Sequence, residues 1–102
     1  MIADVEQKQG VVADLCRQFH VNRLYLFGSA TGAQFNPTSS DLDFIVAFQP
    51  LPSGQYADAY FGLAHALEAL FQRKVDLVTE RSIRNPYFKE EVEETRLLVY
   101  SE

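Results

Sequence analysis

The chain has few of the features that mark secreted, membrane-spanning or nucleic-acid-coating proteins. It has one cysteine in 102 residues, so it cannot form an internal disulfide, which agrees with a reducing compartment. No window of 18 apolar residues is present, and we expect no contact with the membrane interior. The first ten residues carry Asp4 and Glu6 and lack a basic-then-apolar signal pattern. We therefore expect a cytoplasmic protein.

Basic residues are also scarce, since nine lysines and arginines stand against 14 aspartates and glutamates, for a net charge of −5. An extended nucleic-acid surface normally needs a basic stripe to meet the phosphate backbone, and we expect no such surface on this chain. A single nucleotide is compatible with this charge, because its phosphates can be bound through metal ions and backbone N–H groups. The hydrophobic fraction of 47% indicates a globular protein, which we expect to be one domain over residues 1–102.

Apolar periodicity predicts helices that alternate with short strands. The expected helices, from helical spacing or from an Asn-Pro start, cover Val5–His20, Tyr56–Phe71 and Pro86–Thr95. The expected strands cover Arg23–Phe27, Asp41–Phe48 and Lys74–Thr79, with the tail Leu97–Tyr100 as a candidate closing strand. Strands separated by helices predict an α/β fold, a small mixed β-sheet with helices packed against it.

A Gly-Ser pair directly follows the first expected strand. Gly28 permits a tight turn and a close approach of the backbone to a ligand. Ser29 can start a short helix, to about Gln34, whose first N–H groups are open to an anion. In isolation this pattern is weak, because a Gly-Ser pair after a strand is usually only a turn.

Three aspartates stand in or next to the other two expected strands. Asp41 and Asp43 are two residues apart, so in a strand their side chains share a face. Asp76 interrupts an apolar strand, and it is either an exposed position on an edge strand or a carboxylate that has a partner. If the third strand lies beside the second, the three carboxylates converge and repel one another.

Mg²⁺ would remove this repulsion, because it is a hard cation that prefers oxygen ligands and keeps water positions free for phosphate. Two such ions can clamp an in-line phosphoryl displacement, and the third acid can orient or deprotonate an attacking hydroxyl.

Other reactive or charged side chains have simpler explanations. Cys16 lies on the apolar stripe of the first helix and is expected to pack as a small hydrophobic residue. His20 falls at a helix end, and His65 has no second histidine or cysteine at metal-binding spacing. The last helix has an acidic outer face, which is expected to be solvent-exposed or, alternatively, to dock on a basic partner. That face consists of Glu90, Glu91, Glu93 and Glu94.

Together the motifs resemble those of the minimal nucleotidyltransferases, a family of the polymerase-beta-like superfamily. The residues that carry the resemblance are Phe27-Gly28-Ser29, Ser40-Asp41-Leu42-Asp43 and Val75-Asp76-Leu77-Val78. The ending from Asn85-Pro86-Tyr87-Phe88 to Tyr100 also resembles the small antitoxin members of HEPN/MNT toxin–antitoxin pairs. The resemblance covers about Val21 to Tyr100, and the trio of motifs is fairly specific although no single part is.

The resemblance implies a role for each of these residues. Gly28 and Ser29 would hold the nucleotide phosphates, while Asp41, Asp43 and Asp76 would be catalytic and bind Mg²⁺, with Mn²⁺ as an alternative. The implied reaction is the transfer of AMP from ATP to a tyrosine hydroxyl of a partner HEPN ribonuclease toxin. The chain would act as the antitoxin and form a hetero-oligomer with that toxin.

Two features depart from the family pattern. Many members carry an arginine just after the Gly-Ser pair, where this chain has Ala30-Thr31-Gly32, and the loop from Gly28 to Asp41 is one residue longer. Loss of a guanidinium weakens the contact with a triphosphate, because arginine suits bidentate phosphate binding. Arg81 or Arg84, in the loop after the third strand, is a candidate substitute.

Three functions stay open on the sequence alone. In the first, the enzyme modifies a partner protein, because 102 residues leave no room for a separate domain that binds the acceptor. In the second, the chain is a catalytically weak or inactive antitoxin that neutralises its toxin by binding alone, as the altered loop after Ser29 suggests. In the third, the acceptor is a hydroxyl of a small molecule.

Overall fold

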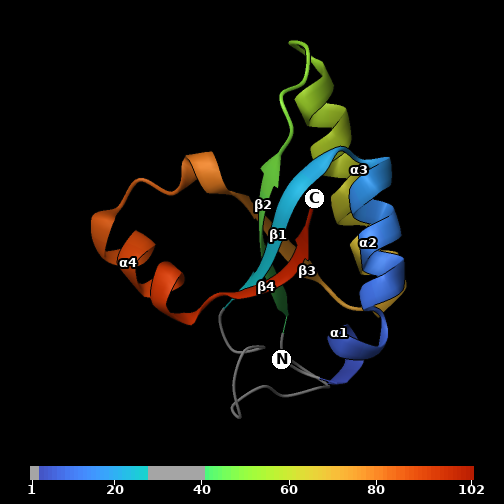
Figure 1. The fold of residues 1–102 in the computed structure, drawn as a ribbon, viewed down its shortest axis with the longest axis horizontal. Helices are drawn as coiled ribbons and strands as arrows, with labels where there is room; N and C mark the ends of the chain where they lie inside the picture. The colour runs from blue at the N-terminus through green and yellow to red at the C-terminus, as the bar shows by residue number, and fades with distance from the viewer. Residues whose placement is uncertain (1–2, 28–40) are drawn as a thin grey trace.

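The computed structural model describes residues 3–27 and 41–102, apart from the side chains of Phe88 and Glu91. Gly28, Ser29 and the short helix expected up to Gln34 lie outside the described residues. Figure 1 shows how the helices and strands are arranged. In chain order they are α1 (Ala3–Gln7), α2 (Gln9–Gln18), β1 (Val21–Phe27), β2 (Leu42–Phe48), α3 (Gln55–Phe71), β3 (Val75–Thr79), the 3-10 turn η2 (Glu80–Ser82), α4 (Pro86–Thr95) and β4 (Leu97–Ser101).

The four strands form one sheet in the order β3-β2-β1-β4. β1 pairs antiparallel with both β2 and β4, whereas β2 and β3 are parallel. Parallel neighbours need a crossover connection, which α3 supplies between β2 and β3. The expected small mixed sheet with packed helices is confirmed, and the apolar tail at Leu97 forms an edge strand.

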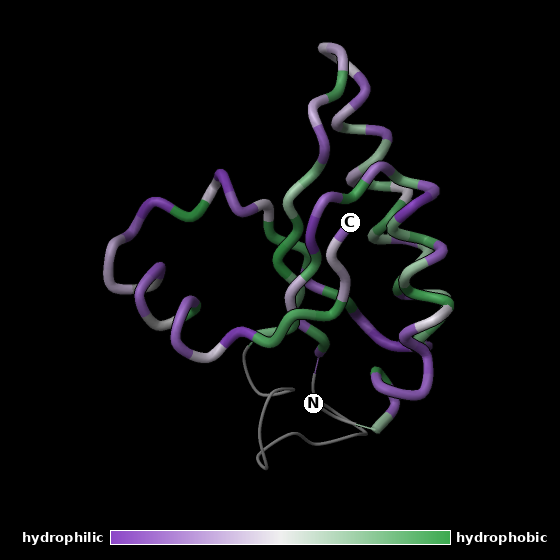
Figure 2. Tube along the Cα trace, in the orientation of Figure 1, coloured by the Kyte–Doolittle hydropathy of each residue, from purple (hydrophilic) through white to green (hydrophobic). Residues whose placement is uncertain are grey.

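The helices divide between the two faces of the sheet. Helices α2 and α3 cover one face, and α4 lies on the other (Figure 1). Hydrophobic residues concentrate in the strands, while α4 is mostly hydrophilic (Figure 2). The larger core lies between the sheet and the first three helices, and its buried members are Val5, Val12, Cys16, Val21, Leu24, Leu26, Leu42, Phe44, Val46, Leu63, Leu67, Phe71, Val75 and Leu77. Across residues 3–27 and 41–102, no helix has the length and apolar character needed to cross a bilayer.

The expectation of one helix over Val5–His20 is wrong, because the structure divides this segment into α1 and α2. The break falls at Lys8, whose backbone leaves the helical region at φ −103° and ψ 10°. The Lys8 ammonium reaches the end of α3, where it donates to the carbonyl of Leu70 and lies 5.4 Å from the ring centroid of Phe71. These long-range contacts stabilise the break. The apolar periodicity that predicted one continuous helix carries no information about them.

Candidate active site

Asp43 and Asp76 lie directly opposite each other on neighbouring strands. β2 and β3 pair in parallel, and these two residues are Cα partners in the register. Ile45, two residues beyond Asp43, packs on Val92 of α4, so the strand period places Asp43 on the same face of the sheet as α4. The structure therefore brings the acids of the two strands together on the face opposite α2 and α3.

Asp41 stands just before β2, at the same end of the sheet. The backbone N–H of Leu42 donates to the carbonyl of Lys74 at 3.1 Å, which joins the two segments at their start. One carboxylate oxygen of Asp41, Oδ2, lies 3.9 Å from Nζ of Lys74. Among the ion pairs of the described residues, this one brings a positive charge, the ammonium of Lys74, to the acids of the site.

Crowding of the carboxylates changes the proton affinity of Asp43. The pKa of Asp43 is raised from its ordinary value of 3.8 to about 6. Burial is the largest cause, followed by the negative charge of Asp76, a hydrogen bond with Asp76 and the charge of Asp41. All three acids thus interact electrostatically, and a group that favours the ionised form of Asp43 would relieve the repulsion.

Asp76 combines the two alternatives that the sequence left open. β3 is an edge strand, and Asp76 is exposed, as an alternating residue on such a strand would be. Its neighbour on the paired strand is nevertheless Asp43, so the exposed position is also part of the acidic group. An exposed carboxylate beside a half-buried one leaves room for a ligand from solvent.

The donor set fits a hard divalent cation. Among the described residues, no group of three or more His, Cys, Asp or Glu side chains is already arranged to hold a metal ion. In this arrangement the carboxylate of Asp41 is paired with the ammonium of Lys74. Among the described residues, Asp41, Asp43 and Asp76 offer carboxylate oxygens, the type of donor that Mg²⁺ and Mn²⁺ bind, and a cation would offset the burial and the neighbouring negative charges that raise the pKa of Asp43.

The Gly-Ser pair follows β1 directly in the chain. Gly28 and Ser29 lie outside the described residues, so their phosphate-binding role stays a prediction. Phe27, the last described residue before them, is the Cα partner of Asp43. The pair therefore follows in the chain directly after a residue that neighbours the acids.

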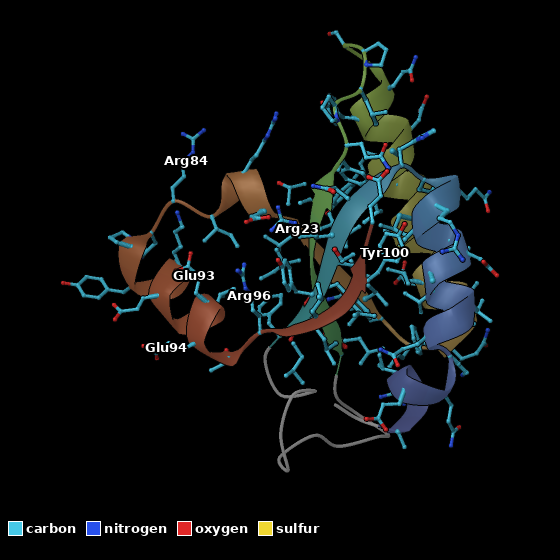
Figure 3. All side chains as sticks on the ribbon, in the orientation of Figure 1. Arg23, Arg84, Glu93, Glu94, Arg96 and Tyr100 are labelled. Carbon is cyan, nitrogen blue, oxygen red and sulfur yellow. The ribbon has the colours of Figure 1, made fainter. Side chains whose placement is uncertain are left out.

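The two arginines considered as substitutes are not placed beside the acids. Arg81 lines a cavity of about 460 Å³ together with Val46, Ala47 and Phe48, at the opposite end of β2 from Asp43. Arg84 is exposed, and its side chain extends away from the sheet (Figure 3). None of the three aspartates lines this cavity.

Helix α4 covers the middle of the sheet face on which the acids lie. Val92 is buried and packs against Tyr25 and Ile45, as expected for an inward residue of this helix. The guanidinium of Arg96 lies 4.1 Å from the ring centroid of Tyr25, between α4 and the sheet (Figure 3). Glu90, Glu93 and Glu94 are exposed, as expected for the acidic outer face of this helix.

Sequence reasoning missed Lys74 as a member of this group. Its position opposite Asp41 depends on the register of two parallel strands, and that register is a property of the fold. The only signal in the sequence is a cation directly before Val75 and two residues before Asp76.

Carboxylates from two adjacent strands, grouped at one end of a sheet, are the arrangement expected of an enzyme for metal-assisted phosphoryl or nucleotidyl transfer. The family model described as "Nucleotidyltransferase domain" matches residues 9–99. The chain belongs to this family and is a nucleotidyltransferase.

Relatives and solved structures agree with this assignment. A Methanocaldococcus jannaschii protein named as a candidate protein adenylyltransferase is 37% identical over 83 residues, which are 80% of each chain. A solved structure described as that of a minimal nucleotidyltransferase is 30% identical, with a TM-score of 0.74, and the match covers 90% of this chain and 89% of the other. A toxin–antitoxin crystal structure with AMP-PNP is 25% identical, with a TM-score of 0.67, over 92% of this chain and 73% of the other.

Proposed function

We propose that the protein transfers AMP from ATP to a tyrosine hydroxyl of a partner toxin of the HEPN type, and so acts as that toxin's antitoxin. The observation that carries the proposal is the pairing of Asp43 with Asp76, with Asp41 at the same end of the sheet. The adenylyltransferase name of the Methanocaldococcus jannaschii relative and the AMP-PNP toxin–antitoxin structure support adenylyl transfer and a toxin as the partner. A cytoplasmic location fits the buried thiol of Cys16, and we include it in the proposal.

The reaction balances as an in-line displacement at the α-phosphorus. The tyrosine oxygen forms a bond to that phosphorus, the bond to the bridging oxygen of the β-phosphate breaks, and pyrophosphate leaves with the electron pair. Asp41, Asp43 and Asp76 would hold Mg²⁺ or Mn²⁺, which when bound offsets the negative charge of the phosphates.

The chain's own residues have distinct tasks in this scheme. Asp43 is half-buried beside two other carboxylates, and it must be ionised to bind a cation. Its partial burial restricts the motion of the carboxylate that would bind the metal. Asp76 is exposed on an edge strand, so its carboxylate can reach an incoming hydroxyl and orient it or take its proton. Gly28 and Ser29 would hold the phosphates through backbone N–H groups.

The direct test mixes the protein with ATP labelled on the α-phosphate, Mg²⁺ and the product of the neighbouring gene. We expect label on a tyrosine of the partner, and loss of labelling in Asp43→Asn. Asp14→Asn is the matched control, because it removes one negative charge from an exposed ion pair with Arg17 on α2. Absence of transfer by the wild-type protein with either Mg²⁺ or Mn²⁺ would contradict the proposal.

A second candidate is an antitoxin that acts by binding alone. Two observations favour it, namely Ala30 in place of an arginine and the pairing of Asp41 with Lys74 instead of a preformed metal cage. Cells that carry the toxin with the Asp41→Asn, Asp43→Asn double variant separate the two candidates. Full rescue by the double variant indicates occlusion, whereas loss of rescue with intact complex formation indicates chemistry.

A further inference from the structure

Four side chains form a two-by-two array at the start of β2 and β3. Asp43 lies opposite Asp76 in the register of the two strands. Asp41 and Lys74 precede these residues by two positions each, and the hydrogen bond from Leu42 to the carbonyl of Lys74 fixes their alignment. The ion pair of Lys74 with Asp41, at 3.9 Å, shows that these two side chains share a side of the sheet. The array therefore holds three acids and one base.

The ion pair itself contributes little to folding. The Lys74 side chain is 68% exposed and the Asp41 side chain 42% exposed. Water and salt screen a pair of this kind, and it must hold two mobile side chains in one geometry, so it is a weak source of stability. A structural role does not account well for a cation at the corner of an acidic array.

Three other cations of the described residues form ion pairs away from the acids. These ion pairs join Lys8 to Asp4 on α1, Arg17 to Asp14 on α2, and Arg96 to Glu80. Arg81 lines the cavity at the far end of β2. Lys74 is thus the cation that an ion pair ties to the acids of the site.

We propose that Lys74 binds the phosphates of the nucleotide, after pairing with Asp41 in the metal-free protein. The inference rests on the proposed function, because it takes the acidic array to be the nucleotide site. When the carboxylate of Asp41 binds a metal ion, Lys74 would lose its ion-pair partner. The triphosphate of the nucleotide would bring several negative charges to the same site, and Lys74 could pair with them instead. The ammonium of lysine is a point charge on a flexible four-carbon stem, so it can change partners within its own reach.

The proposal predicts discrimination between nucleotides by their phosphate charge. In the Lys74→Gln variant, we expect the affinity for ATP in the presence of Mg²⁺ to fall about fivefold, the value of one exposed charge contact. AMP, which lacks the β- and γ-phosphates, should lose clearly less affinity. Lys74→Arg keeps the charge and should bind ATP within about twofold of the wild type, because a point-charge contact with phosphate depends little on the shape of the head group.

The experiment is calorimetric titration of ATP and of AMP, with Mg²⁺ and without an acceptor protein, so that no turnover is needed. The matched control is Lys89→Gln, which removes the same charge from an exposed position on α4. Melting curves without metal check that all variants fold. We expect them to lie close to the wild-type curve, because substitutions of exposed lysines usually change stability very little.

The outcomes separate the inference from the proposed function. Unchanged ATP affinity in Lys74→Gln, or an equal loss for ATP and AMP, overturns the role of Lys74 and leaves the nucleotide site standing. An equal loss in Lys89→Gln also overturns it, because the effect then belongs to net charge. Failure of the wild-type protein to bind ATP overturns the proposed function and the role of Lys74 together.

Discussion

Asp43 and Asp76 occupy partner positions on two parallel strands, and the negative charge of Asp76 contributes to the raised pKa of Asp43. The pKa of Asp43 reaches about 6, through burial first and the charge of Asp76 second. A stable fold gains nothing from two acids in this relationship, because their repulsion opposes folding at neutral pH. Groups whose pKa is perturbed by burial together with a charged neighbour are frequent in functional sites, and this pair is the centre of the site proposed for the enzyme.

Replacement of Asp43 by asparagine should stabilise the metal-free protein at neutral pH. The folded protein binds the Asp43 proton more tightly than the unfolded chain does, so the free energy of unfolding falls as pH rises from about 4 to 6 and then levels off. Asp43→Asn should remove this fall and be more stable at pH 7 by about 1 kcal/mol, after allowance for solvent screening at a partly exposed group.

Urea denaturation with a chelator present, at several pH values across this window, measures the effect. Asp14→Asn, on α2 at the other face of the sheet, should follow the wild-type pH profile, because Asp14 lies in an exposed ion pair with Arg17 away from the acids of the site. A profile of Asp43→Asn that runs parallel to the wild type would show that the acids do not interact in this way.

Divalent metal should reverse the order of stability. A ligand that binds only the folded state stabilises it by mass action, by about 2.7 kcal/mol at 100 times its Kd. With Mg²⁺ the wild type should therefore gain more in Tm than Asp43→Asn or Asp76→Asn, each of which removes one of the proposed carboxylate ligands. Differential scanning calorimetry with and without Mg²⁺ gives the comparison, and equal shifts in all three proteins would exclude a shared metal site at these residues.

Short periods in the sequence were sufficient to predict the strands and the shared face of Asp41 and Asp43, whereas the approach of Asp76 was expected only if the third strand lay beside the second, as it does. The two-residue spacing of Asp41 and Asp43 places them on one face, and the helix between the second and third strands allows Asp76 to return beside them. Gly28 and Ser29 stay predictions, since they lie outside the described residues.

What the sequence could not supply depends on contacts between distant segments. The break at Lys8 follows from its contacts with the end of α3, more than 60 residues away along the chain. Lys74 meets Asp41 only through the strand register, and Arg81 stands far from the acids because β3 carries it to the other end of the sheet. Each of these facts requires the three-dimensional arrangement.

The single thiol should be unreactive until the protein unfolds. Burial raises the pKa of Cys16 to about 12, and the nearby charge of Arg17 lowers it by a smaller amount. The thiolate is the reactive form, so labelling by a thiol reagent at pH 8 should be slow in the native protein and fast in urea. Rapid, complete labelling under native conditions would contradict the buried position of Cys16 between α2 and the sheet.

Two glycines should respond in opposite ways to alanine. A Cβ at Gly62 would overlap the ring of Phe19, where α3 approaches the end of α2, whereas a Cβ at Gly10 would meet nothing within 4 Å. We expect Gly62→Ala to lose about 1 kcal/mol, since overpacking outweighs the gain in helix propensity. Gly10→Ala should gain up to about 1 kcal/mol from propensity alone. Urea denaturation of both variants gives the comparison, and equal changes would show that the contact with Phe19 does not limit packing.

The most direct test of the account is a crystal structure of the protein with Mn²⁺ and a non-hydrolysable ATP analogue, with data collected to locate the metal by anomalous scattering. We predict an anomalous peak in contact with the carboxylates of Asp41, Asp43 and Asp76, with the phosphates of the analogue on the same side of the sheet as α4. A peak elsewhere, or an analogue bound away from these three carboxylates, would contradict the proposed site and the reaction assigned to it.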